Sequence, residues 1–364
     1  MPSHLKAVTD PEFLALAERS PHPLPIEQAP RWDAYDRATV GRTRWGRYAV
    51  LDDADQALAI IALTEFAGRG FRYLWAKHGP VWLQAEPPTA AQEAALREAL
   101  LADVRRRDPG IAFVRLHAEH RAPELHELLQ TVTYDRTVIL DPRRTEDELF
   151  AEMKKGDRYS VRKAVKDETM TVAEETGRGP AAFDELYAVL RETAERDSFG
   201  IYPASVYRTM LDTLGDAARV FVARRDGRVL AWAIVTVYDG GATYYYGAGT
   251  AEGRKALAAY RVQWEVLRVL RVEGVRHYDL MGVASDRAPQ LAGVSDFKTK
   301  FAAGTTAVPG AWDVPARPGR YALLVRALRA KRALGGLHAK RALGGLRAKR
   351  ALGGLLGRVR SGSR

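Results

Sequence analysis

Two short segments combine residue types that could do chemistry by themselves. His117 and His120, with Glu119 between them, offer imidazole and carboxylate groups of the kind that bind Zn²⁺. No further ligand cluster accompanies them, so we interpret them as surface residues and expect no metal site. Residues 247–254 (GAGTAEGR) lie between a predicted strand and a predicted helix, where backbone amides can cradle a phosphate. The Arg and Gly spacing of a coenzyme A site is missing, and we favour a plain turn.

Other chemistries are excluded by what the sequence lacks. It contains no cysteine, which removes disulfides, thiolate nucleophiles and iron–sulfur clusters. The zinc-protease pattern HExxH, the P-loop pattern GxxxxGKS and the hydrolase pattern GxSxG do not occur. We therefore expect neither a metal nor a cofactor.

A basic group is carried by the segment RYSVRKA, residues 158–164. Arg162 and Lys163 follow Arg158 by four and five residues, so on a helix the three could share one side and hold RNA or phosphate. The alternative interpretation is a solvated helix face.

The predicted helices and strands indicate two domains of the α+β class. The chain has 364 residues, more than one domain usually contains, and its 46% hydrophobic and 28% charged residues are ordinary globular composition. Strands are predicted near residues 47–51, 57–66 and 72–75, followed by a helix over 90–107 and a strand that begins at 111. Asp141 and Pro142 mark a break after this first half.

The second half is predicted to begin with helices over residues 146–154 and 182–196. Three strands at hairpin spacing follow between residues 219 and 249, then a helix over 255–273 and a strand over 277–283. This succession describes an antiparallel sheet with packed helices, and it is similar to a GNAT-type acyltransferase domain.

The net charge of +11 is concentrated in the C-terminal tail. Residues 316–364 hold 14 Lys and Arg and no Asp or Glu, which leaves 42 basic against 45 acidic residues elsewhere. A nine-residue repeat begins at Ala330, Ala339 and Ala348, and each copy contains a Gly pair that disfavours helix. We expect a mostly unfolded basic arm for an anionic membrane surface or tRNA phosphates; a repeat without a role is the alternative.

We also expect a cytoplasmic protein. The first 30 residues contain four acidic residues and no apolar run of signal-peptide length. The apolar stretch over 229–237 is the length of a strand, not of a membrane span.

Several segments, in their order and spacing, together resemble the FemABX family of tRNA-dependent peptidyltransferases, over roughly residues 20–312. These segments are residues 28–32, 77–80 (KHGP), 158–164, 192–201 (ETAERDSFGI), 260–265 (YRVQWE), 278–283 (YDLMGV) and 293–301 (GVSDFKTKF). The resemblance implies transfer of an amino acid from aminoacyl-tRNA onto the stem peptide of a peptidoglycan precursor. The precursor is lipid-linked or UDP-linked, and we favour the lipid-linked form at the inner face of the cell membrane.

The resemblance also implies a pair of GNAT-like domains in which the last segment returns to the first domain. We expect the first domain at residues 1–142 with about 307–325, the second at 143–306, and the tail at 326–364. The chain has no room for the long helical hairpin of larger relatives.

For catalysis, the resemblance places the active-site lysine at Lys298, and Lys300 is its nearest competitor. An aminoacyl ester is already activated, so the enzyme must align an amine with the ester carbonyl and stabilise an oxyanion, which one fixed ammonium can do. Asp279, at the end of a predicted strand, could orient the amine or the lysine, or serve only as a structural hydrogen-bond partner.

Among the remaining site residues, the resemblance implies that Arg37 and Arg208 contact phosphate. The diphosphate of the acceptor calls for Arg or Lys. We expect substrate binding by Arg37, Lys77, Tyr207, Arg208 and Tyr246, and tRNA binding by Arg158, Arg162, Lys163 and Lys300. Surface ion pairs are the alternative for Arg37 and Arg208, and core packing is the alternative for Tyr246. In the run Tyr244 to Tyr246, alternate side chains should point to opposite faces of the sheet.

Two departures from the family pattern and two rival functions stay open. His117 and Ala118 stand where relatives often have Asp and Pro, and residues 166–169 lack a Gly that often follows the RKA helix. The acceptor could instead be a peptide antibiotic or another small amine. A nonenzymatic nucleic-acid-binding protein is the third hypothesis.

Overall fold

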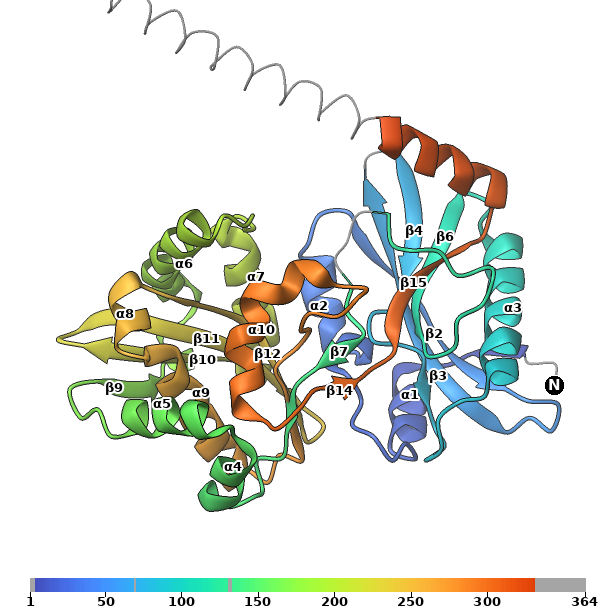
Figure 1. The fold of residues 1–364 in the computed structure, drawn as a ribbon. Coiled ribbons are helices and arrows are strands. Elements are labelled where there is room, and N and C mark those ends of the chain that lie inside the picture. The colour runs from blue at the N-terminus through green and yellow to red at the C-terminus, as the bar shows by residue number, and fades with distance from the viewer. Residues whose placement is uncertain (1–3, 69, 130–132, 331–364) are drawn as a thin grey trace, which may run out of the picture.

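The computed structural model describes residues 4–68, 70–129 and 133–330. It contains two large sheets, each with its own helices, which lie side by side (Figure 1). The strands of the first sheet, in spatial order, are β1 (His4–Ala7), β2 (Arg42–Leu51), β3 (Ala57–Gly68), β4 (Phe71–Trp75), β6 (Ile111–Ala118) and β15 (Gly310–Pro315), with β5 (Val81–Trp82) paired to β3. Only the β4–β6 pair is parallel.

Two of the three helices described in this first half begin at side-chain caps. They are α1 (Asp10–Ala17), α2 (Trp32–Arg37) and α3 (Ala90–Arg107), with the 3₁₀ turn η1 (Ile26–Gln28). Thr9 and Glu12 form a capping box at α1, and Thr89 and Gln92 form one at α3. Such a cap stabilises a helix by about 1 kcal/mol. Leucines of α3 pack on the inner face of the sheet and close the first core.

The first sheet is completed by a segment from the far end of the chain. β15 pairs antiparallel with β6, and residues 318–330 then form a helix that packs against Phe113 through Tyr321. The chain thus returns to the first sheet after forming the second. The division into domains at residues 142 and 306 stays our prediction.

The second sheet is covered by helices on both faces. Its order is β8 (Ile139–Leu140), β13 (His277–Asp279), β12 (Gly241–Gly249), β11 (Arg228–Tyr238), β10 (Ala218–Arg225) and β9 (Thr171–Glu174). A separate ribbon pairs β7 (Arg136–Thr137) with β14 (Thr306–Ala307). Central strand β11 is apolar on both sides: Ala233 and Val235 face one core, and Trp232 and Ile234 face the other. That pattern explains its unbroken apolar run.

The helices of the second half are α4 (Glu146–Glu152), α5 (Lys155–Val165), α6 (Phe183–Asp197), α7 (Ala204–Leu214), α8 (Ala251–Lys255), α9 (Ala258–Val272) and α10 (Ala292–Lys298). Short 3₁₀ turns are η2 (Thr176–Arg178), η3 (Pro180–Ala182), η4 (Gly215–Ala217), η5 (Pro289–Leu291) and η6 (Thr299–Phe301). The predicted helix over 255–273 is in fact α8 and α9. Leu257, with a φ of 59°, breaks it.

These elements agree with the predicted α+β class. The nine-residue repeats from residue 331 onward lie outside the described residues. No helix within the described ranges is both long enough and apolar enough to cross a membrane.

Candidate functional site

Asp279 lies where the second sheet opens. β12 and β13 run parallel and pair at only three positions, the last being Thr243 with Asp279. β13 ends there, while β12 continues to Gly249. The carboxylate of Asp279 accepts hydrogen bonds from the Thr137 hydroxyl and, at 2.6 Å, from the backbone N–H of Met281. Asp279 is therefore fixed at the splayed end of two parallel strands.

Lys298 is the last residue of α10 and is largely buried beside this opening. Its Nζ atom donates a hydrogen bond of 2.9 Å to the carbonyl oxygen of Gly282. Burial lowers the pKa of Lys298 to about 8, although the charge of Asp279 acts in the opposite direction. The structure thus brings the two predicted catalytic residues close enough to interact electrostatically.

Tyr134 connects this pair to the first half of the chain. Its ring lies against Gly282, where an added Cβ atom would come within 2.5 Å of the Tyr134 ring. Burial raises the pKa of Tyr134 well above its usual value, and the charges of Asp279 and Glu27 raise it further. Tyr134 therefore lies near carboxylates from both halves.

Glu27 belongs to a polar cluster at the interface between the first and second halves of the chain. Its side chain is only 6% exposed, and its Oε1 atom lies 3.5 Å from Lys77 Nζ and 3.7 Å from His78 Nε2. The Tyr245 hydroxyl, from β12, donates to the same Oε1 atom at 2.9 Å. Burial opposes ionisation, but the charges of His78 and Lys77 outweigh it and lower the pKa of Glu27.

Lys77, a predicted substrate-binding residue, belongs to the same cluster as Glu27. Its Nζ atom donates to the Tyr245 hydroxyl and lies 4.8 Å from the ring centroids of both Trp32 and Tyr245. Burial lowers the pKa of Lys77 despite the charge of Glu27. Lys77 thus links the first half of the chain to Tyr245 of the second half.

A cavity of about 110 Å³ lies between the two halves. Glu27 and His78 line it from the first half, and Thr243, His277 and Asp279 line it from the second. Burial lowers the pKa of His277. The arrangement can hold a small hydrogen-bonding group between two carboxylates, one of which, Asp279, also acts on the charge of Lys298.

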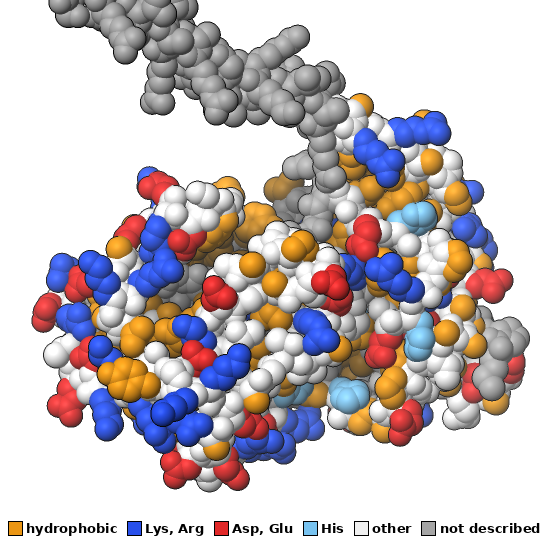
Figure 2. All heavy atoms as spheres, in the orientation of Figure 1, with side chains coloured by type: hydrophobic (Ala, Val, Ile, Leu, Met, Phe, Trp, Pro, Cys, Tyr) orange, Lys and Arg blue, Asp and Glu red, His pale blue; other side chains and the backbone are white. Residues whose placement is uncertain are grey.

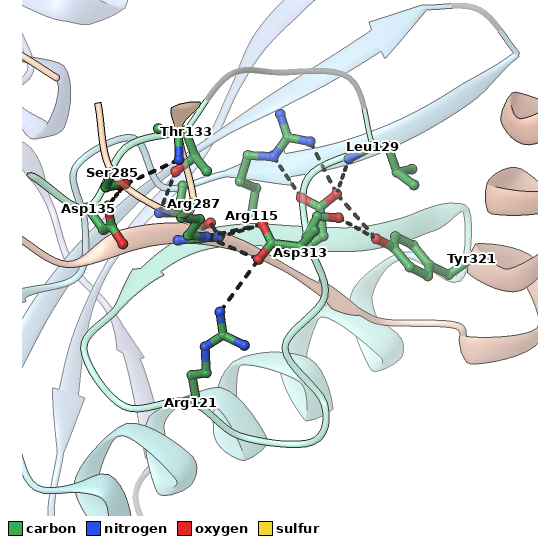
Figure 3. Close-up of polar contacts among 12 residues, drawn as sticks. Arg115, Arg121, Leu129, Thr133, Asp135, Ser285, Arg287, Asp313 and Tyr321 are labelled. Atoms are coloured by element: carbon green, nitrogen blue, oxygen red, sulfur yellow. Dashed lines mark hydrogen bonds and ion pairs between the residues drawn. The ribbon is translucent and has the colours of Figure 1, made fainter. Parts of the chain in front are cut away.

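The loop that carries Gly282 is bound to the first sheet through Arg287, which Figure 3 shows together with Ser285. Arg287 forms ion pairs with Glu127, donates to the Ala311 carbonyl at 2.5 Å, and stacks over the Trp312 ring at 3.5 Å. Ser285 donates to Asp135 at 2.5 Å (Figure 3). The partner carbonyl of Lys298 is thereby fixed relative to β15.

Asp313 anchors the strand to which this loop is bound. Its carboxylate accepts two hydrogen bonds from Arg115 and one each from the Leu129 N–H and the Tyr321 hydroxyl (Figure 3). Asp313 is fully buried. Because β15 is held on several sides, the loop rests on a rigid support.

The predicted phosphate-binding arginines lie at the surface. Arg37 is exposed at the end of α2 and has no ion pair with any residue that the structure describes. Arg208 is 39% exposed and pairs with Asp184 at 3.0 Å. This contact agrees with the alternative interpretation of Arg208 as a surface ion pair.

Tyr207 and Tyr246 pack against each other. Tyr207 is buried, stacks on Phe183 with ring centroids 5.3 Å apart, and meets Tyr246 edge-on at 4.9 Å. Burial raises the pKa of Tyr207 to about 12 and raises that of Tyr246 further. Both side chains belong chiefly to the core between β12 and the helices α6 and α7.

The expected alternation of the tyrosine run is wrong at one position. Tyr244 pairs with Val235 and Tyr246 with Ile234, so the register shifts by a bulge at Tyr245. Tyr244 packs in one core, whereas Tyr245 and Tyr246 both pack in the other. The extra residue re-aims Tyr245 toward Glu27, which simple strand alternation could not predict.

The residues predicted to bind tRNA divide into two groups. Arg162 and Lys163 are exposed on α5. Arg158 donates to the Met153 carbonyl at 3.1 Å and so also closes the end of α4. Lys300 lies 4.0 Å from Asp157 and over the Tyr260 ring. Asp157 is two residues after Lys155, so this contact lies on the opposite side of α5 from the basic residues.

The two segments that first suggested chemistry are occupied by structural contacts. His117 stacks on His78, and its Nδ1 atom contacts the Pro309 carbonyl at 2.9 Å. Burial lowers the pKa of His117 to about 3, so the ring is neutral. The described residues contain no group of three or more His, Asp or Glu suited to a metal ion.

The segment predicted as a plain turn forms a short capped helix instead. The N–H groups at the start of α8 bind Glu192 and Thr250, at 2.7 Å to Ala251 and 2.9 Å to Gly253. Those amides are therefore not free to hold a phosphate.

Sequence reasoning missed Glu27, Tyr134 and Tyr245. Glu27 directly precedes Gln28, the first residue of the matching segments, so its position in the chain is the one signal that could have marked it. Tyr134 lies between predicted elements, and no local pattern marks it. The direction of the Tyr245 side chain depends on the β-bulge in β12, which no sequence pattern marks.

Comparisons with known proteins agree with this geometry. The acetyltransferase (GNAT) domain model matches residues 151–299. The chain is 30% identical over 112 residues to the UDP-N-acetylmuramoylpentapeptide-lysine N(6)-alanyltransferase of Weissella viridescens, a match covering 30% of this chain and 33% of that relative. The crystal structure of FemX superposes with a TM-score of 0.69 at 15% identity, covering 88% of this chain and 100% of FemX.

These matches confirm the FemABX resemblance. A tandem GNAT protein from the clavulanic acid biosynthesis pathway gives a TM-score of 0.50 at 14% identity, covering 87% of this chain and 99% of its own. The α+β fold with two GNAT-like domains is thus confirmed. The matched segment spans about a third of the Weissella alanyltransferase. The comparisons therefore support the fold and the family resemblance of this chain.

Proposed function

We propose that this FemABX-type protein is an aminoacyltransferase that moves an amino acid from aminoacyl-tRNA to an amine of a peptidoglycan-precursor stem peptide. The observation that carries the proposal is the lysine at the end of α10, with a pKa near 8, beside Asp279 where β12 and β13 separate. The name of the Weissella alanyltransferase, which describes transfer to a lysine of such a precursor, supports the substrate class.

The reaction needs one bond formed and one broken. The acceptor amine attacks the ester carbonyl, a C–N bond forms, and the tetrahedral intermediate carries the negative charge on oxygen. The C–O bond to the ribose then breaks, the leaving 3′ oxygen takes up a proton, and the amine nitrogen loses one. Loss of a single oxyanion stabiliser typically costs about 3 kcal/mol of transition-state stabilisation.

Lys298 can both stabilise the oxyanion and give a proton to the leaving oxygen in this reaction. As an ammonium it can stabilise the oxyanion, and with a pKa of about 8 it releases a proton to the leaving oxygen more readily than an ordinary lysine. Asp279 favours the ammonium form through its negative charge. In our proposal Asp279 therefore acts mainly through Lys298.

We assign the acceptor, the stem peptide of the precursor, to the interface between the two halves of the chain. The cavity beside Glu27 and Asp279 suits the amine end of the stem peptide, because the two carboxylates can accept hydrogen bonds from its N–H groups. We propose that Arg37 and Arg208 contact the diphosphate, and that Lys77, Tyr207 and Tyr246 shape the space between. For Arg208 this requires exchange of Asp184 for a phosphate.

We further propose that the protein works in the cytoplasm, at the inner face of the membrane when its acceptor is lipid-linked. The basic C-terminal tail would supply the attraction to anionic lipids, at about 1 kcal/mol for each Lys or Arg near the surface.

One incubation tests the activity. Purified protein is mixed with lipid-linked and UDP-linked precursors, total charged tRNA and, in parallel, soluble peptide amines. Mass spectrometry should show the mass of one or more amino acids added to a precursor, dependent on charged tRNA. Addition to the peptide amines alone would support the antibiotic-type acceptor instead, and no tRNA-dependent addition to any acceptor would overturn the proposal.

A further inference from the structure

Helix α5 carries a basic stripe along one side. Lys155, Arg158, Arg162, Lys163 and Lys166 follow one another at intervals of three, four, one and three residues, which keeps them on one face of the helix. Tyr159 lies in the middle of this stripe and is 70% exposed. Figure 2 shows Lys and Arg side chains gathered on the part of the surface where Figure 1 places α5.

The stripe forms one wall of an open groove of about 980 Å³. Lys255 of α8 and Arg225 of β10 line the other side. The groove also contains Asp167 and Glu252, but both carboxylates bind Arg225, at 2.9 and 3.5 Å. Among the residues that the structure describes, none offers a carboxylate to the five basic residues of the stripe or to Lys255.

Contacts within the fold account for only part of this arrangement: Arg158 donates to the Met153 carbonyl, and Arg162 lies over the Phe150 ring at 4.7 Å. Arg158 and Arg162, and Arg162 and Lys166, are four residues apart on the helix, and like charges at that spacing repel. Lys155 adds a positive charge to the first turn of α5, where the helix dipole is unfavourable to cations. The apolar contacts of α5 come from Val161 and Ala164 on its other side. Such a surface is explained by an anionic partner.

We infer that this groove binds the phosphate backbone of RNA, with Tyr159 stacking on a base or ribose. An exposed aromatic ring within a basic groove is the usual means of holding nucleic acid without reading its sequence. A lipid bilayer is flat, whereas these charges line a groove. A groove fits the phosphate backbone of RNA better than it fits a membrane surface. The inference rests on the proposed function for the identity of the RNA, aminoacyl-tRNA.

The groove and the reactive lysine occupy different sides of α5. Lys300, two residues after Lys298, contacts Asp157 on the side of the helix away from the stripe. The groove therefore takes RNA at a distance from the ester, and the 3′ end passes around α5 to reach Lys298. An aminoacylated RNA that is too short to reach from the groove to Lys298 should gain no binding affinity from the groove.

The test compares two full-length variants with equal change of charge. In the first, Lys163→Glu and Lys166→Glu reverse two exposed stripe residues. In the control, Arg19→Glu and Arg191→Glu reverse two exposed residues outside the groove, which form no ion pair with the described residues. Fluorescence anisotropy with labelled tRNA, at several salt concentrations, gives the affinity and its salt dependence.

The stripe variant should bind tRNA at least tenfold more weakly than the control. Its slope of log affinity against log salt should fall by about 1.5, because each lost phosphate contact contributes about 0.7 to 0.9. Tyr159→Ala should weaken binding and Tyr159→Phe should not. Equal tRNA affinity of stripe and control variants would overturn the inference, as would loss of binding to anionic vesicles with tRNA binding unchanged.

A kinetic comparison separates this inference from the proposed function. With aminoacyl-tRNA as donor, the stripe variant should show a higher KM. With an aminoacylated dinucleotide it should match the wild type. If the wild type transfers from neither donor, the proposed activity fails, while the binding measurement still decides the role of the groove.

Discussion

The Nζ atom of Lys298 donates a hydrogen bond of 2.9 Å to the carbonyl oxygen of Gly282. This contact joins the end of α10 to the loop after β13, the loop that Arg287 binds to the first sheet. Gly282 has no room for a Cβ atom because the Tyr134 ring lies against it. The position of the ammonium group is therefore set by contacts from both halves of the molecule.

Removal of that ammonium group should abolish most of the transfer activity. We expect Lys298→Ala to lower kcat/KM by about a hundredfold or more, which corresponds to about 3 kcal/mol of lost transition-state stabilisation. Single-turnover transfer from charged tRNA measures it. Lys300→Ala is the matched control and should retain kcat, since Lys300 is paired with Asp157 and Tyr260. Full activity of Lys298→Ala would remove the basis of the mechanism.

The pH dependence should report the charge on Lys298. Because the ammonium is the active form and its pKa is about 8, kcat should fall as the pH rises through that value. Asp279 raises this pKa by its negative charge, so Asp279→Asn should move the fall in kcat to lower pH. Profiles from about pH 6 to about pH 10 measure the shift.

Asp157→Asn serves as control for that shift, because Asp157 lies next to Lys300 and not Lys298. Its alkaline limb should coincide with that of the wild type. An Asp279→Asn profile identical to the wild type would mean that Asp279 is only a structural hydrogen-bond partner of Thr137 and Met281.

The family motifs predicted the fold. They also pointed to Lys298 and Asp279, because these residues lie in short segments with a fixed local order, and the catalytic roles of the two stay predictions. The bulge at Tyr245 and the contact with Glu27 could not be predicted, since they depend on register between β11 and β12 and on how the halves meet. Arg208 was expected at a phosphate and is found on Asp184. A sequence gives no means of knowing which carboxylate a surface arginine will meet.

The tail prediction concerns residues outside the described structure. Deleting residues 331–364 removes ten Lys and Arg. Binding to anionic vesicles at low salt should weaken, since each such residue contributes about 1 kcal/mol near the surface. Turnover of a UDP-linked acceptor should be unchanged. Vesicle co-sedimentation and the soluble assay measure the two properties, and equal vesicle binding by both proteins would contradict the role.

The cluster around Glu27 should matter for stability. Glu27→Gln leaves the Lys77 ammonium buried without its carboxylate, and we expect the free energy of unfolding to fall by about 3 kcal/mol. Urea denaturation measures it. Glu27→Gln combined with Lys77→Met should recover much of the loss, because neither charge then remains. Asp184→Asn, in an exposed pair, is the control and should cost less than about 1 kcal/mol.

The same Asp184→Asn variant tests the acceptor contact of Arg208. In the free protein Asp184 competes for the guanidinium that we assign to a phosphate, at 3.0 Å. Without that competitor, KM for a UDP-linked acceptor should fall severalfold, whereas Arg208→Ala and Arg37→Ala should each raise it. None of the three should change KM for a stem peptide that lacks the diphosphate, because the contact is with phosphate oxygens. If Asp184→Asn leaves both KM values unchanged while Arg208→Ala raises them equally, Arg208 supports the fold of α7 and does not bind the acceptor.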